Sequence, residues 1–165
     1  MILSRAGGAL LTALALLAVA SAPTHAQQHV PIVPELRIDV LGAHPTSVQG
    51  AAGVEIPAGT YARVGVLAGA GATIEGDGRP RAAGRVDVLA RFLLDPFRQS
   101  RWGFSAGAGV SLRADPGDRV RARLLAALDL EGRRSRGGLS PSLQIGLGGG
   151  VRGGVGLRWS GRSAR

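Results

Sequence analysis

Few side chains in this sequence are suited to catalysis. The chain has no cysteine and three histidines, and His44 lies near Ser47 in a turn that contains Pro45. A lipid-directed serine hydrolase would need such a pair together with an acid that orients the imidazole. Because no acid is placed for that role, we interpret His44 as a solvated turn residue. We expect no catalytic residue, no metal site and no cofactor, and keep a barrel enzyme acting on outer-membrane lipid as an alternative.

Arginine is the residue type in this sequence that is best suited to binding a ligand. All 20 basic residues are arginines, against 11 acids, and the net charge is +9. They are scattered singly along alternating segments with few aromatic residues to stack on bases, so we expect no nucleic-acid partner. Guanidinium groups bind phosphate in a bidentate manner, which makes an anion site one interpretation. The arginines that would gather in it are Arg81, Arg85, Arg113, Arg119, Arg121 and Arg152.

A second interpretation of the same charges is a set of structural ion pairs, and we favour it. Glu55 and Arg63 flank the turn at 57–59 and are expected to pair across two strands. The other acids expected to take part are Asp39, Asp87, Asp129 and Glu131. Acids are outnumbered on this polar face, so we expect some of the arginines to meet water or external anions.

The segment 102–131 indicates which elements position these residues. Trp102, Phe104 and Ala106 begin an apolar row that alternates with glycine, serine and arginine, and the alternation resumes after the turn at 114–118. A period of two over about twelve residues is typical of a β-strand with unlike faces. Average strands have about five or six residues, whereas a bilayer requires roughly nine to eleven tilted ones.

The same alternation recurs along most of the chain and predicts eight strands joined by short turns. We expect them over residues 36–40, 48–56, 62–72, 81–92, 102–113, 119–131, 139–147 and 151–159. Successive antiparallel strands form a meander, and eight of them can close without exposed edges. The predicted fold is therefore an all-β, eight-stranded, antiparallel up-and-down transmembrane β-barrel.

The distribution of glycine predicts which face lies inside. Much of the polar face is glycine, which weakens a strand and suits a place where space is tight. A narrow lumen that also holds arginines offers such a place, and the opposite aliphatic face suits lipid. A soluble secreted lipocalin-like barrel that binds an apolar ligand remains an alternative, as does a narrow anion leak. The aromatic residues gather near the turns at 57–59, 95–101 and 132–138, so at most one aromatic girdle is expected.

The N-terminus has the features of an export signal. Arg5 precedes an apolar run from Ala9 to Ala20, and Thr24-His25-Ala26 resembles a cleavage site. We expect a signal peptide at 1–26 cleaved near Ala26, a leader at 27–34, the barrel at 35–160 and a short basic tail at 161–165.

A signal peptide followed by eight amphipathic strands resembles the small outer-membrane β-barrel proteins of Gram-negative-type bacteria. The final strand resembles their C-terminal assembly signal, with Val155, Leu157 and Trp159 alternating toward an aromatic residue. The resemblance implies a monomer in the outer membrane and recognition by the barrel-assembly machinery. We expect a structural or interaction role, with outer-membrane lipid as the partner, including lipopolysaccharide phosphates at the arginines named above.

Overall fold

The computed structural model describes residues 32–44, 46–74, 79–97, 100–115 and 120–160. The predicted signal peptide at 1–26, the tail at 161–165 and Arg119 lie outside the described residues. Among the residues described, no helix has the length and apolar character needed to cross a bilayer.

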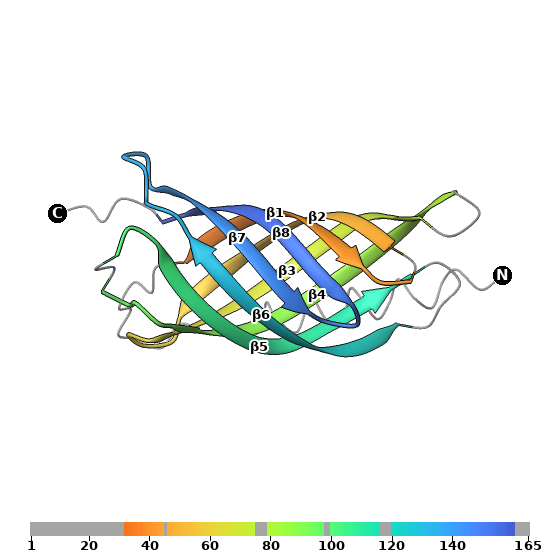
Figure 1. Ribbon diagram of the computed structural model, residues 1–165, viewed down its shortest axis with the longest axis horizontal. Coiled ribbons are helices and arrows are strands. Elements are labelled where there is room, and N and C mark those ends of the chain that lie inside the picture. The colour runs from red at the N-terminus through yellow and green to blue at the C-terminus, as the bar shows by residue number, and fades with distance from the viewer. Residues whose placement is uncertain (1–31, 45, 75–78, 98–99, 116–119, 161–165) are drawn as a thin grey trace, which may run out of the picture. The chain divides into compact units, whose positions relative to one another are not determined.

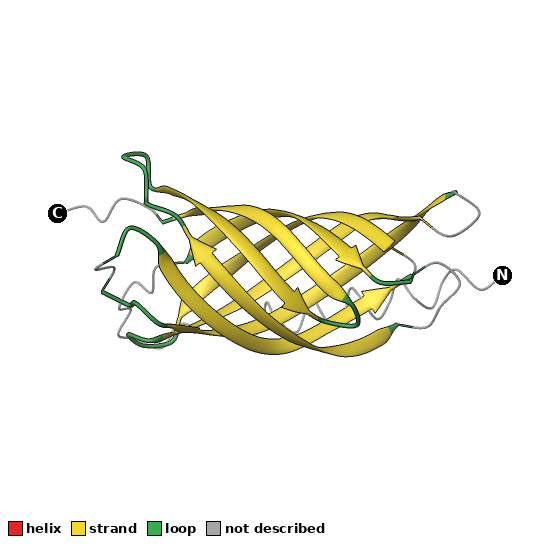
Figure 2. Cartoon of the chain, in the orientation of Figure 1, coloured by secondary structure: helices red, strands yellow, loops and turns green. Residues whose placement is uncertain are grey.

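Eight antiparallel strands close into a barrel, with each strand paired to its neighbours in sequence and β1 paired to β8 (Figures 1 and 2). The strands are β1 (Val33–Gly42), β2 (Thr46–Pro57), β3 (Ala62–Ile74), β4 (Pro80–Leu93), β5 (Gly103–Ala114), β6 (Arg121–Glu131), β7 (Leu139–Leu147) and β8 (Val151–Trp159). The predicted all-β meander barrel is confirmed. The strand pattern placed the start of the barrel at residue 35, but β1 begins two residues earlier, because Val33 already pairs with Glu55.

The two faces of each strand differ sharply in polarity and in exposure. On β1, Glu35, Arg37 and Asp39 are buried inside the barrel, whereas the alternate residues Leu36, Ile38 and Val40 point outward. The exterior is apolar on the other strands as well, and Ile38 is 60% exposed. The period-two pattern of the sequence therefore corresponds to a polar interior and an apolar exterior.

Glycines and leucines share the interior with the charged residues. A Cβ atom on Gly109 would overlap the carbonyl oxygen of Val88, so the residue at this interior position must be small. Leu89 and Leu125 are buried in contact with one another beside this glycine. Glycine thus lets larger side chains fill a lumen that an eight-stranded barrel leaves only just wide enough for them.

The two ends of the barrel differ in composition. We call the end where β1 begins and β8 ends the terminal mouth; its turns cover 58–61, 94–102 and 132–138. The other end, where β1 ends and β8 begins, is the distal mouth, and the strands that meet there are joined through residues 43–45, 75–79, 115–120 and 148–150. All six aromatic residues lie in the turns of the terminal mouth or within two residues of a strand end there. Tyr61 stacks on Phe92 with ring centroids 5.9 Å apart, which joins neighbouring turns into one partial girdle.

Candidate functional site

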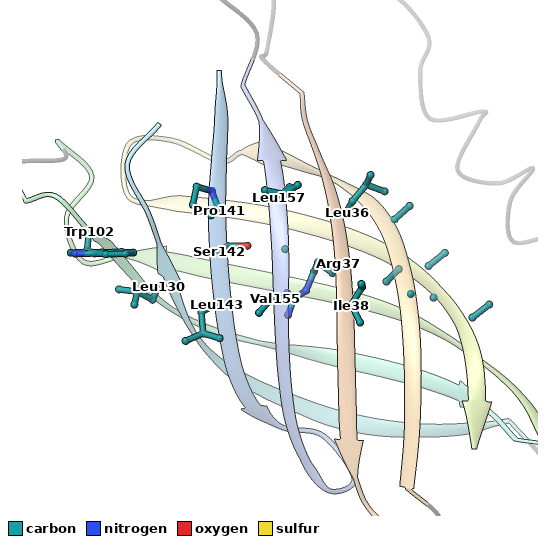
Figure 3. Close-up of a pocket in the computed structure, with 17 residues that line it drawn as sticks. Leu36, Arg37, Ile38, Trp102, Leu130, Pro141, Ser142, Leu143, Val155 and Leu157 are labelled. Atoms are coloured by element: carbon teal, nitrogen blue, oxygen red, sulfur yellow. The ribbon is translucent and has the colours of Figure 1, made fainter. Parts of the chain in front are cut away.

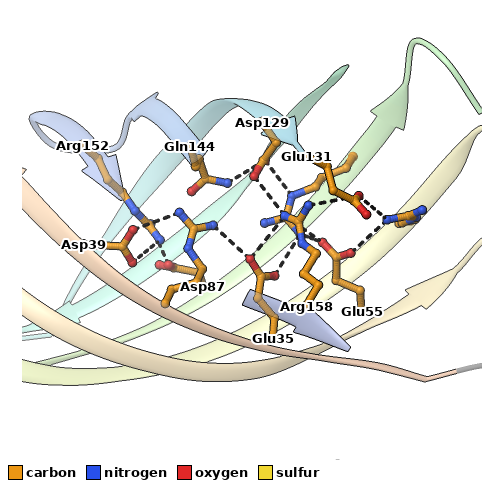
Figure 4. A network of polar contacts seen from close by, with 12 residues as sticks. Glu35, Asp39, Glu55, Asp87, Asp129, Glu131, Gln144, Arg152 and Arg158 are labelled. Carbon is orange, nitrogen blue, oxygen red and sulfur yellow. Dashed lines mark hydrogen bonds and ion pairs between the residues drawn. The ribbon is translucent and has the colours of Figure 1, made fainter. Parts of the chain in front are cut away.

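The interior of the barrel holds a dense network of ion pairs (Figure 4). Among the described residues, six carboxylates and five arginines are buried there, and a sixth arginine, Arg63, is half-buried. The carboxylates are Glu35, Asp39, Glu55, Asp87, Asp129 and Glu131, and the buried arginines are Arg37, Arg85, Arg91, Arg152 and Arg158.

The half of the network nearer the distal mouth centres on two aspartates. Asp39 on β1 accepts hydrogen bonds from Arg85 on β4 and, over 3.2 Å, from Arg152 on β8. Asp87 lies 2.7 Å from Arg152 and 3.1 Å from Arg85, so both arginines are shared between the same two carboxylates. Ser111 on β5 donates a further hydrogen bond to Asp87 over 2.6 Å. Four strands are thereby connected through the lumen.

The half nearer the terminal mouth centres on Arg91 and Arg158. Arg91 pairs with Glu55 and donates to Asp129 over 2.9 Å. Arg158 lies 3.0 Å from Asp129, 3.3 Å from Glu35 and 3.5 Å from Glu131. Gln144 donates to Asp129 over 2.7 Å and supplies a neutral partner from β7.

Arg37 connects the two halves. Its Nη1 lies 3.5 Å from Glu35 and its Nη2 lies 2.9 Å from Asp39. Residues two apart on a strand point to the same face, so the local sequence Glu-Leu-Arg-Ile-Asp at 35–39 aligns acid, base and acid along the lumen. The network therefore extends along the barrel as one connected set.

The acids named from the sequence all lie in this network. Glu55 and Arg63 are 3.5 Å apart, but they are diagonal neighbours, because the register sets Glu55 opposite Gly65 and Arg63 opposite Pro57. Arg63 also reaches Glu131 over 3.3 Å. Asp39, Asp87 and Asp129 bind arginines of other strands.

The arginines named as an anion site that the structure describes all lie toward the distal mouth, where the register sets Arg113 between Arg85 and Arg121, but they differ in burial and in partners. Arg85 and Arg152 belong to the buried network, Arg113 binds Asp115 over 2.9 Å, and Arg81 and Arg121 are exposed at the distal mouth. The surplus of arginine over acid lies at the mouths, where Arg81 and Arg121 are exposed as expected for some of these arginines, and not in the closed part of the barrel. Six carboxylates there face six arginines when Arg63 is included, and the other described arginines lie at the two mouths.

Sequence reasoning did not single out Glu35, Arg37, Arg91, Arg158 or Gln144 as site residues. The first four alternate on the polar face with residues that were named, so the period of two was the available signal; Gln144 lies on β7, where no site residue was named. Their partners could not be found from sequence, because the pairs join strands across the lumen. Ser47 is buried and His44 is exposed, so the pair considered for hydrolysis does not share one face of the barrel.

The network is suited to holding the barrel together rather than to reacting with a substrate. Its acids and bases neutralise one another, and breaking a buried pair leaves an uncompensated charge at a cost of about 3–5 kcal/mol. Among the described residues there is no group of three or more His, Cys, Asp or Glu side chains that could hold a metal ion.

The fold and this interior define a class of protein: a closed, eight-stranded antiparallel barrel with a charged, filled lumen and an apolar outer surface. Comparison with protein-family models gives no match for the chain, and comparison with curated proteins gives none either.

Proposed function

We propose that this chain is a small outer-membrane β-barrel protein of a Gram-negative-type bacterium, with a structural or interaction role. The observation that carries the proposal is the inverted distribution of polarity. Charged residues such as Asp39, which is 0% exposed, are buried, while large apolar residues such as Leu143 and Val155 face outward.

The outer surface is unfavourable in water and favourable in lipid. Soluble proteins rarely expose contiguous apolar patches larger than a few hundred Å², whereas here apolar residues face outward on every strand. The strands have 9 to 14 residues, which is sufficient for the roughly nine to eleven tilted residues of one bilayer crossing. The closed strand order also leaves no unpaired sheet edge, whose backbone N–H and C=O groups would lack hydrogen-bond partners in lipid.

The filled lumen favours a structural role over the alternatives. An apolar ligand, as in a lipocalin-like barrel, would have to replace the interior ion pairs that cross the lumen. An anion leak would require a path past the arginine–carboxylate pairs, which neutralise one another. Catalysis on lipid receives no support from His44 and Ser47, which lie in different environments.

The expected partners follow from the same proposal. Val155, Leu157 and Trp159 end the closing strand β8, and we propose that they are recognised by the barrel-assembly machinery. Arg81 and Arg121, exposed at the distal mouth, are candidates for contact with lipopolysaccharide phosphates if that mouth faces outward. The barrel would act as a monomer.

Fractionation of the expressed protein tests the proposal. We expect recovery in the outer membrane and a gel mobility that changes on boiling, as for a closed barrel that resists detergent until it is heated. Recovery as a soluble periplasmic or secreted protein would contradict it.

A further inference from the structure

A basic pocket of about 600 Å³ opens at the terminal mouth, next to the aromatic residues. Its lining consists of Ser100, Arg101, Gly103, Glu131, Gly132, Arg133 and Arg134. The carboxylate in that lining, Glu131, already lies 3.3 Å from Arg63 and 3.5 Å from Arg158. The carboxylate of Glu131 therefore also faces two arginines inside the barrel, and the lining of the pocket carries three positive charges and one negative charge.

Hydrogen bonds of the described residues position the backbone next to these arginines. Asp95 accepts hydrogen bonds from the backbone nitrogen and the hydroxyl of Ser100, over 2.9 and 2.8 Å, which fixes the chain just before Arg101. In the second turn, the backbone nitrogen of Ser135 donates to the carbonyl oxygen of Leu139 over 2.7 Å. Arg134 donates to the carbonyl oxygen of Ser160, just after the end of β8.

An apolar groove of about 1070 Å³ runs over the outer face of the barrel from the same place (Figure 3). Trp102, Leu130 and Pro141 line it close to the pocket, and Leu143 and Leu157 line it further on. The groove continues over β1 to β3, where small residues such as Ala52 and Ala68 line it.

Gly132 lies where the groove and the pocket meet. Its backbone nitrogen donates to the carbonyl oxygen of Pro141 over 2.8 Å, and it follows Glu131 in the lining of the pocket. A Cβ atom added to Gly132 would lie 2.9 Å from Pro141 Cγ and 3.2 Å from Trp102 Cζ3. The basic and apolar hollows therefore form one continuous amphipathic surface with an indole ring at its boundary.

We propose that this surface binds an anionic glycerophospholipid, with the phosphate between Arg101, Arg133 and Arg134 and an acyl chain along the groove. The inference rests on the proposed membrane location and adds a ligand class at the terminal mouth. Arginine forks match phosphate geometry, and aromatic residues prefer the headgroup level of a bilayer. A free phosphate would use the arginines alone, whereas a phospholipid also uses the groove that leads away from them.

Quenching of Trp102 fluorescence by brominated lipid tests the inference. The mature chain carrying Trp159→Phe, so that Trp102 is its sole tryptophan, is folded into phosphatidylcholine vesicles that contain a small fraction of brominated phosphatidylglycerol. Parallel vesicles contain the same fraction of brominated phosphatidylcholine. We expect the charged lipid to associate roughly fivefold more strongly, the factor that corresponds to about 1 kcal/mol from exposed ion pairs.

Two matched triple variants locate the effect. Arg101→Gln/Arg133→Gln/Arg134→Gln is expected to abolish the preference for phosphatidylglycerol. Arg79→Gln/Arg123→Gln/Arg136→Gln makes the same charge change outside the lining of the pocket and is expected to retain the preference. The boiling-dependent gel shift verifies that each variant is folded, and Arg101→Gln alone serves if the triple variant does not fold.

The other outcomes overturn specific parts of the inference. Equal quenching by both lipids, or equal loss in both triple variants, would exclude a phosphate site in this pocket. Release of the brominated phosphatidylglycerol by millimolar glycerol 3-phosphate would assign the arginines to a soluble anion. A lack of quenching by either lipid, with no insertion into vesicles, would contradict the membrane proposal and the inference together.

Discussion

Arg37 donates from Nη2 to Oδ1 of Asp39 over 2.9 Å, two positions further along the same strand. The opposite end of the same guanidinium reaches Glu35 over 3.5 Å. One side chain therefore joins the aspartate cluster near the distal mouth to the glutamate-containing cluster near the terminal mouth. A buried arginine with two carboxylate partners is expected to contribute strongly to stability.

Replacement of Arg37 by alanine should destabilise the barrel by about 3–5 kcal/mol, because it leaves Glu35 and Asp39 each with one counterion fewer inside the barrel. The measurement is the urea midpoint of the protein folded in vesicles, followed by gel mobility. Arg136→Ala, in an exposed turn, is the control and should change stability by no more than about 0.5 kcal/mol. An unchanged midpoint for Arg37→Ala would show that the ion pairs of Arg37 do not contribute to the stability of the barrel.

The filled lumen predicts very low conductance. In planar bilayers the unmodified barrel should show no stable open level, because paired guanidinium and carboxylate groups occupy the interior. Arg91→Ala/Arg158→Ala removes two large side chains and leaves Glu35, Glu55 and Asp129 with fewer counterions. This variant should conduct and should favour cations. An anion-selective current from the unmodified protein would instead support a leak.

Glycine substitutions should separate the interior from the exterior of the barrel. Gly109→Ala places a methyl group against the carbonyl oxygen of Val88, so this variant should fold poorly or lose its boiling-dependent mobility shift. Gly153→Ala is the matched control, because an added Cβ atom meets no other atom within 4 Å. It should leave stability unchanged or raise it by up to about 1 kcal/mol, through the reduced entropy of the unfolded chain. Equal tolerance at both positions would mean that the lumen is wider than the contacts indicate.

A charge on the outer face distinguishes lipid from water. Leu143 lies at the centre of β7, faces outward and is 47% exposed, so arginine there would sit near the bilayer midplane. In a membrane, Leu143→Arg should cost about 2–4 kcal/mol, whereas in a water-soluble barrel it would cost almost nothing. The urea midpoint in vesicles gives the value.

The control for this position is Thr46→Arg, because Thr46 is exposed at the distal mouth end of β2. The expected change at this site is close to zero in either environment. If Leu143→Arg behaves like Thr46→Arg, the apolar surface of the barrel does not face lipid.

Much of the fold follows from the sequence because alternation has only one structural meaning over this length. The rows that begin at Leu36 and Trp102 keep a period of two, and the structure has all eight strands that this pattern predicts. The ends of the strands follow less directly from the pattern: Trp102 continues the apolar row, but β5 begins one residue later, at Gly103. Local pattern therefore fixes the faces of a strand better than its limits.

The site was predictable residue by residue but not pair by pair. Asp39 could be assigned to the lumen from its neighbours Leu36 to Val40, but its partners Arg85 and Arg152 lie on β4 and β8. Which residues meet depends on the stagger of the strands, and no single strand encodes that quantity. Arg81 was placed inside by the same alternation, yet it is exposed because it lies near the start of β4, at the open mouth.

The ladder between β1 and β8 makes the strand order circular, since Glu35 pairs with Arg158 as regularly as Leu143 pairs with Val155. Because every strand is hydrogen-bonded to two neighbours, the chain termini can be moved to another connection without breaking a strand pair. A circular permutant could join residue 160 to residue 32 through a short linker and open the chain between Gly149 and Gly150. It would keep every strand pair, but β8 would be covalently joined to β1 in place of β7. Both chain ends of such a permutant would emerge at the distal mouth, which would offer an attachment point for a fused peptide at the opposite end from the aromatic residues.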